Sequence, residues 1–164
     1  MGLLEHFRIL ARYNKIANER LYASCAQLSI AELTSPSQSS FGSIHGLLNH
    51  VLLGDRIWLA RFEGGGAVTP PLNTILYEKF DALRTARVET DNQIMTFFEE
   101  ADADLMGRSF PYINNQGKPY VEQAGVAMAH FFNHQTHHRG QIHALVSQSG
   151  QTPPSLDLHR IINP

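Results

Sequence analysis

The sequence is poor in cysteine, since Cys25 is the only one among 164 residues. A single cysteine cannot form a disulfide within the chain, and this usage is typical of proteins in a reducing compartment. We therefore expect a cytoplasmic protein. Because Cys25 falls on the apolar stripe of a predicted helix, we interpret it as a small buried residue rather than a reactive thiol.

The sequence also lacks an excess of charge and any long hydrophobic run. The formal net charge is −2, which gives no basic surface of the kind that binds nucleic acid. Residues 1–15, MGLLEHFRILARYNK, carry charges every few positions and no continuous apolar run. This pattern argues against a signal peptide or a membrane span. We expect no nucleic acid and no membrane as a partner.

Apolar residues recur at helical spacing over most of the chain, which predicts an all-α fold. The expected helices run from Leu3 to Leu28, from an N-cap at Ser43 to Phe62, from about Ile75 to Ala101, and from about Val121 to Ser149. Before the last of them, NNQG between β-forming residues suggests a short hairpin. The economical account is a four-helix bundle in which residues 1–164 form one domain.

The segment 130–143, HFFNHQTHHRGQIH, holds five of the nine histidines. At about 100° per residue, four of these histidines and Gln141 share one helix face that is apolar before and after them. Each buried imidazole brings a donor and an acceptor that need partners. A metal ion would satisfy several of these groups at once.

His134 and His138 lie four residues apart, so their rings can reach one ion at roughly 2.0–2.1 Å. A third ligand must come from another helix, and His50 is the best-placed histidine because the surrounding pattern predicts its burial. His134 with His137 is an alternative pair, and His130 is a candidate fourth ligand or outer partner. Three imidazoles leave coordination positions open, as in catalytic sites, and do not select the metal.

The alternative interpretation of these residues is a network of hydrogen-bonded histidines between helices. Three further histidines are expected to have no role in the site. His45 falls on the narrow polar arc of the second predicted helix, which predicts an ordinary surface position. His143 and His159 lie outside the histidine stripe.

Charged and amide residues also interrupt the apolar faces of the other predicted helices. Asp55 falls on the apolar side of the second helix, where a buried aspartate needs a partner. Arg87 and Asp91 either mark a solvated edge of the third helix, or Arg87 meets Asp55 or an anionic ligand. Asn14 and Asn18 in the first helix are interpreted as register-setting or partly exposed residues, with at most an indirect role in the site.

Several stretches resemble one family. FFNHQTHHRGQI resembles the signature helix of the DinB/YfiT-like metal-binding superfamily, and SIHGLLNHVLLGDRIWL is similar to its second helix. ARYNKIANERL and TPPSLDLHRI also resemble that family, so the likeness spans nearly the whole chain. It implies a four-helix bundle with long crossover connections, often dimeric. It also implies that His50, His134 and His138 are the metal ligands, since His138 directly precedes the Arg-Gly-Gln sequence.

The resemblance implies a divalent-metal-dependent enzyme, because characterised relatives include transferases and isomerases that use bacillithiol, mycothiol or glutathione. We expect a low-molecular-weight-thiol S-transferase or a detoxifying hydrolase, with a metal-bound thiolate or water as the nucleophile. One first-row transition metal is expected, zinc or nickel before iron or manganese. The alternative is a non-catalytic metal-binding stress-response protein, or a dimeric bundle with a structural metal. No catalytic acid or base is assigned; the candidates are His130, His137, Asp55 and Arg87.

Overall fold

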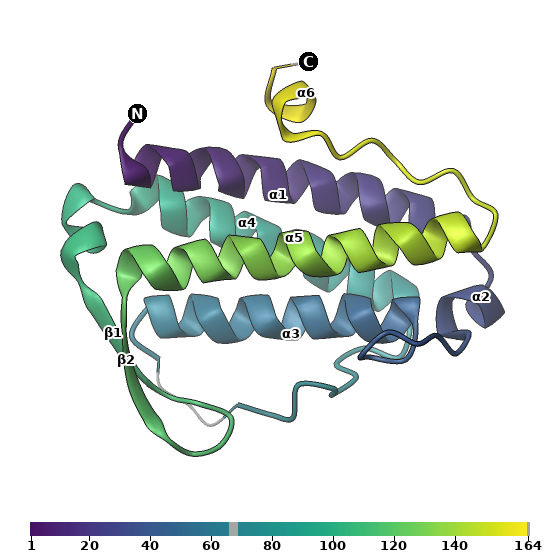
Figure 1. Cartoon of the computed structure of the whole chain (residues 1–164), viewed down its shortest axis with the longest axis horizontal. Helices are drawn as coiled ribbons and strands as arrows, with labels where there is room; N and C mark the ends of the chain where they lie inside the picture. Colours follow the sequence, from purple (N-terminus) through teal and green to yellow (C-terminus); the bar gives the residue numbers. More distant parts are fainter. Residues whose placement is uncertain (66–68, 164) are drawn as a thin grey trace.

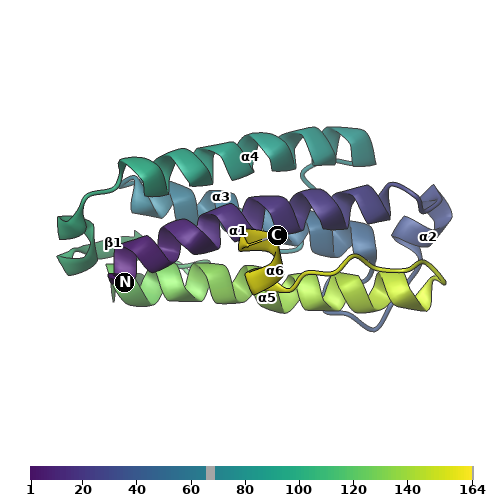
Figure 2. The same cartoon turned by 90° about the horizontal axis from the view of Figure 1, so that it is seen from above.

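The computed structural model describes residues 1–65 and 69–163, and the chain is mostly helical with one small sheet (Figure 1). α1 packs against α4 and α5, and α3 also packs against α4 and α5. Figure 2 shows α6 lying over α1 and α5, with the carboxyl end of the chain beside it. No helix in this part of the chain combines the length and the apolarity that crossing a bilayer requires. The elements are α1 (Leu3–Cys25), α2 (Ile30–Thr34), α3 (Ile44–Phe62), α4 (Phe80–Glu100), the 3₁₀ helix η1 (Ala103–Gly107), β1 (Ser109–Ile113), β2 (Pro119–Gln123), α5 (Ala124–Gln148) and α6 (Leu158–Ile162).

The predicted hairpin before the last long helix is confirmed. β1 and β2 pair in antiparallel register, with Tyr112 opposite Tyr120. Gly117 has a φ of 76° at the turn, a conformation that glycine adopts without strain. Because β2 continues to Gln123, α5 begins at Ala124 rather than near Val121.

The starts of two long helices show how local hydrogen bonds set the boundaries. The Ser43 hydroxyl accepts a hydrogen bond from the Gly46 backbone N–H, which confirms the predicted N-cap of α3. α4 begins at Phe80, so the prediction that it starts near Ile75 is wrong. The backbone N–H groups of Leu76 and Tyr77 donate to Asn49 Oδ1 at 2.9 and 3.0 Å, which ties this segment to α3 instead of to a helix.

A layer of buried polar side chains separates two apolar clusters. One cluster is rich in phenylalanine and lies at the hairpin end, and the other is mainly aliphatic and lies near α2. Each long helix carries buried polar residues between the positions that join the two clusters. This layer consists of Asn14 and Asn18 on α1, Asp55 on α3, Arg87, Thr90 and Asp91 on α4, and Gln135 and Arg139 on α5. The histidine site lies at this level of the structure.

Candidate metal centre

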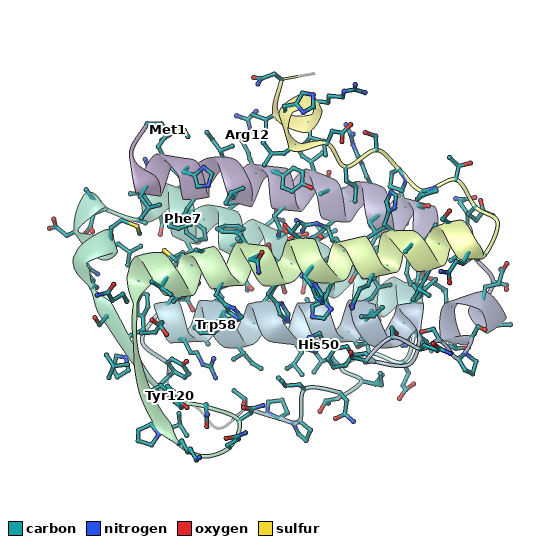
Figure 3. The ribbon with its side chains drawn as sticks, in the orientation of Figure 1. Met1, Phe7, Arg12, His50, Trp58 and Tyr120 are labelled. Atoms are coloured by element: carbon teal, nitrogen blue, oxygen red, sulfur yellow. The ribbon has the colours of Figure 1, made fainter. Side chains whose placement is uncertain are left out.

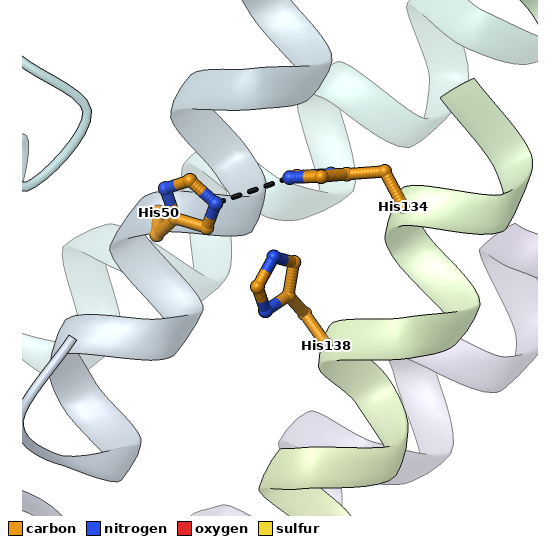
Figure 4. A group of neighbouring side chains, drawn as sticks. All are labelled: His50, His134 and His138. Carbon is orange, nitrogen blue, oxygen red and sulfur yellow. Dashed lines mark hydrogen bonds between the residues drawn. The ribbon is translucent and has the colours of Figure 1, made fainter. Parts of the chain in front are cut away.

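Three histidine rings from two helices converge on one point. α3 contributes His50, and α5 contributes His134 and His138 (Figure 4). One nitrogen of each ring lies within 4.8 Å of the others. The Nε2 atoms of His50 and His134 are 3.1 Å apart, and the ring of His138 closes the third side, 4.6 Å from His50 between centroids. The structure thus brings together the three residues proposed from sequence as ligands.

Hydrogen bonds fix the orientation of two of these rings. His50 Nδ1 lies 2.9 Å from the Leu72 carbonyl oxygen, and His138 Nδ1 lies 2.7 Å from Gln141 Oε1. Both oxygens can only accept, so each Nδ1 carries the proton and donates it. Each Nε2 is therefore left with a lone pair, which is the state that binds a metal. An outer oxygen that fixes the ligand tautomer is the common arrangement around metal-bound histidine.

Two residues shape the space around the rings. The Phe41 ring stacks on His50 with 3.6 Å between centroids. Gly54, one turn after His50 on α3, lies against His134, and a Cβ added there would stand 3.0 Å from His134 Cε1. Since this is tighter than nine in ten Cβ contacts in proteins, glycine at this position allows the His134 ring to approach α3.

We expect Gly54→Ala to lower the affinity for zinc by about tenfold or more, because the added methyl displaces the His134 ring from the position it shares with His50 and His138. The matched control is Gly140→Ala on α5, where a Cβ would meet nothing within 4 Å. Alanine improves helix propensity by about 1 kcal/mol at both sites. Competition titration with a chromogenic zinc chelator would measure the affinities, and equal affinity in the two variants would contradict the expected contact.

The electrostatic surroundings keep the three rings neutral. Burial and, to a smaller extent, repulsion from His138 and His50 together lower the pKa of His134 to about 3. Burial also lowers the pKa values of His50 and His138, although the hydrogen bonds to Leu72 and Gln141 oppose the shift. Because a neutral imidazole is the form that binds metal, protons compete weakly for this site near neutral pH.

The three residues fit a divalent first-row metal. Tetrahedral coordination with bonds of 2.0–2.1 Å places ligand nitrogens about 3.3 Å apart, close to the 3.1 Å between His50 and His134. Two neutral lone pairs facing each other at this distance repel unless a proton or a cation lies between them. Within the described residues no cysteine or carboxylate joins the cluster, so an ion would keep open coordination positions. Imidazole alone does not determine which metal binds.

Comparison with known proteins gives the family. The sequence model of the DinB family matches residues 4–164. The chain belongs to the DinB family. A DinB-like protein from Bacillus cereus ATCC 10987, solved by crystallography, matches the structure with a TM-score of 0.62 and 15% identity, over 85% of this chain and 89% of that one. At this identity the likeness shows the shared fold alone. No curated protein matches the sequence.

The other histidines of this DinB-family chain lie outside the cluster. His137 and His130 are exposed, and their rings lie 4.8 Å from His138 and 6.0 Å from His134 between centroids. His143 bonds the Pro154 carbonyl oxygen and His159 is exposed. The prediction that His45 lies on the surface is wrong, since only 7% of it is exposed. Residues of α2 and of the start of α4 line the same cavity as His45, a packing that helical periodicity does not predict.

The buried aspartate predicted from sequence has the partner suggested for it. Arg87 donates to Asp55 across 2.6 Å and lies 2.9 Å from Asp91. Gln135 Nε2 donates to the other oxygen of Asp55 at 2.9 Å. Burial raises the pKa values of both aspartates, and the charge of Arg87 opposes this shift. The interpretation of Arg87 and Asp91 as a solvated edge is therefore wrong.

Asn14 and Asn18 extend this network to α1, and both are buried. Their amide groups donate to Asp91 Oδ1 at 3.2 and 3.0 Å. Arg139 donates to the Oδ1 atoms of the same two asparagines. Gln135 and Arg139 directly follow His134 and His138 in sequence. The polar layer thus fixes how α5 is rotated about its own axis, and this orientation directs His134 and His138 toward α3.

Sequence reasoning missed the side chains and backbone groups that surround the cluster. Phe41, Gly54 and the Leu72 carbonyl were not identified as part of the site, and neither were Gln135 and Arg139. Gly54 could have been found from the sequence, because it is a glycine inside a predicted helix, one turn after the candidate ligand His50. Leu72 and Phe41 lie outside helices and strands, and periodicity does not predict where such segments run.

Proposed function

We propose that this DinB-family protein is a divalent-metal-dependent enzyme, either a low-molecular-weight-thiol S-transferase or a detoxifying hydrolase. In this proposal His50, His134 and His138 hold one ion. The observation that carries it is the convergence of three neutral ring nitrogens with no fourth side-chain ligand among the described residues. Such a site keeps positions for a small-molecule substrate, as catalytic zinc sites do.

An ion held there would lower the pKa of a bound thiol or water and supply a nucleophile near neutral pH. The residues of the chain have separate tasks. His50 and His138 are oriented by Leu72 and Gln141, and Phe41 covers one face of His50. His130 and His137 are exposed beside the cluster and remain the candidates for proton transfer.

Asp55 and Arg87 are better explained as positioning residues than as an acid and a base. Both side chains are at least 98% buried, and Arg87 forms ion pairs with both Asp55 and Asp91. A substrate at the ring nitrogens would not reach them without opening the polar layer. We therefore assign them to holding α3, α4 and α5 in place.

A structural metal is the second candidate function. His50 lies on α3 while His134 and His138 lie on α5, so an ion would cross-link two long helices that already pack against each other. A non-catalytic metal-binding protein of the stress response would have the same three ligands. Turnover that depends on the metal separates this candidate from the enzyme.

We also infer a four-helix bundle with long crossover connections that forms one domain. The packing of each long helix against two others supports it. We propose a homodimer through an exposed flank of α5 that is lined by small residues, since small side chains let a second helix approach closely. These exposed residues are Ala129, Asn133, Thr136, Gly140, Ala144 and Ser147.

The test is turnover of a thiol with chlorodinitrobenzene as a model electrophile, using glutathione, bacillithiol and mycothiol in parallel, and ester hydrolysis without thiol. We expect one of these activities to be lost after chelation and restored by one equivalent of metal. Rates that do not change on chelation would contradict the enzyme. A large drop in melting temperature on chelation, without turnover of any substrate, would favour the structural metal.

A further inference from the structure

Arg61 is a half-buried cation that packs against two aromatic rings. Its guanidinium carbon lies 4.7 Å from the ring centroid of Trp58 and 4.2 Å from that of Tyr112. Its hydrogen bond goes to the Ile113 carbonyl oxygen at 3.4 Å. Among the described residues no aspartate or glutamate forms an ion pair with it. Among the described residues the charge is thus held by two cation–π contacts and one weak hydrogen bond.

A continuous row of aromatic rings connects Arg61 to the histidine cluster. Trp58 lies 5.2 Å from His130 between ring centroids, and His130 lies 6.0 Å from His134. Figure 3 shows Trp58 on α3 between His50 and the hairpin that carries Tyr120. At 1.5 Å per residue, Arg61 is about 16 Å along the helix from His50 and on the same face. Its side chain leans back toward the cluster, as its position over Trp58 shows.

The contacts of Arg61 leave an edge of its guanidinium available. The rings of Trp58 and Tyr112 are 5.5 Å apart between centroids and meet edge to face, so both contact the guanidinium from one side. Among the described residues its one hydrogen-bond acceptor is the Ile113 carbonyl oxygen, so other N–H groups of the guanidinium stay free to donate. Burial lowers the pKa of Arg61, because the charged guanidinium loses part of its hydration there. A carboxylate on this edge would compensate for that loss through two parallel charge-assisted hydrogen bonds.

We propose that Arg61 binds the carboxylate of the substrate whose reacting end lies at His50, His134 and His138. Trp58 and Tyr112 position the guanidinium, and the ring of His130 lines the path between the two ends. Given the rise of α3 and the backward lean of the side chain, the carboxylate lies on the order of 10 Å from the reacting atom. The substrate class is therefore an elongated carboxylate-bearing thiol rather than a short one. The identity of the reacting end rests on the proposed function, whereas the carboxylate site does not.

The single tryptophan makes binding directly measurable, because all tryptophan fluorescence comes from Trp58. The probes are mercaptooctanoate, its uncharged analogue mercaptooctanol, and the short mercaptopropionate, each titrated into zinc-loaded protein. We expect mercaptooctanoate to bind at least tenfold more tightly than the alcohol. Arg61→Gln is expected to abolish this preference. The matched control is Arg12→Gln, which removes the same charge from an exposed position on α1.

Octanoate and octanol, titrated into metal-free protein, test the carboxylate site at Arg61 separately from the proposed metal-dependent enzyme. A carboxylate preference that depends on Arg61 in this titration supports the site even where no metal-dependent turnover exists. Equal binding of octanoate and octanol, or a preference that survives Arg61→Gln, would overturn it. Where turnover is found, Arg61→Gln should raise KM for the long carboxylate thiol and leave kcat and the KM for mercaptopropionate unchanged. Unchanged KM for both thiols would overturn the carboxylate site and leave the metal-dependent enzyme standing.

Discussion

Replacing Arg87 with alanine is expected to destabilise the protein by about 3–5 kcal/mol, the usual loss when one partner of a buried ion pair is removed. Arg87 is 2% exposed and lies between Asp55 and Asp91. Its loss would leave two buried carboxylates without a cation. Urea unfolding of the metal-free protein, followed by circular dichroism, would measure the change in the free energy of unfolding.

The control for this prediction is Arg84→Ala, since Arg84 is an exposed arginine one turn earlier on the same helix. We expect the control to change the unfolding free energy by no more than about 0.5 kcal/mol. Helix propensity is nearly the same for the two changes, so the difference between them reports the buried network. Similar losses in both variants would mean that the polar layer contributes little to holding the four helices together.

Replacing His138 with alanine is expected to lower zinc affinity more than 100-fold, because one of three ligand nitrogens is lost. Gln141→Ala should lower it by about 10–100-fold, which is the usual effect of removing a group that orients a ligand. The Gln141 oxygen lies 2.7 Å from His138 Nδ1 and fixes which nitrogen carries the proton. Zinc affinities from competition titration would separate the two effects.

His137→Ala is the matched control, because it removes an adjacent but exposed imidazole. Its affinity for zinc should equal that of the unsubstituted protein. An equal loss in the His137 and His138 variants would mean that both residues contact the ion. A loss confined to the His137 variant would favour the alternative pair of His134 with His137. A loss in the Gln141 variant as large as in the His138 variant would indicate that Gln141 itself contacts the ion.

Periodicity alone was sufficient to predict much of this molecule. The spacing of His134 and His138 places both on one helix face in any α-helix, and the burial of His50 follows from its apolar neighbours. The same reasoning placed Asp55 inside the protein and offered Arg87 as one possible partner beside the solvated-edge alternative, and the two residues do meet. These are properties of a single helix, and they need no knowledge of where other elements pack.

Features that depend on packing between elements were not predictable in this way. A helical wheel assigns His45 to a polar arc, but it does not show that residues of α2 and α4 line the same cavity as His45. Likewise Asn49 accepts hydrogen bonds from the backbone N–H groups of Leu76 and Tyr77, which lengthens the loop before α4. Helical propensity does not predict these hydrogen bonds. The contact of Arg61 with Tyr112 joins α3 to the hairpin, two elements far apart in sequence.

The most direct test is the metal content of the purified, untagged protein by elemental analysis, beside His50→Ala, His134→Ala, His138→Ala and His137→Ala. We expect about one first-row metal per chain in the unsubstituted protein and in the His137 variant, and almost none in the other three, all with unchanged helical content. No metal in the unsubstituted protein, even after incubation with zinc, nickel, iron and manganese, would contradict a metal centre. The three rings would then form a hydrogen-bonded histidine network between α3 and α5.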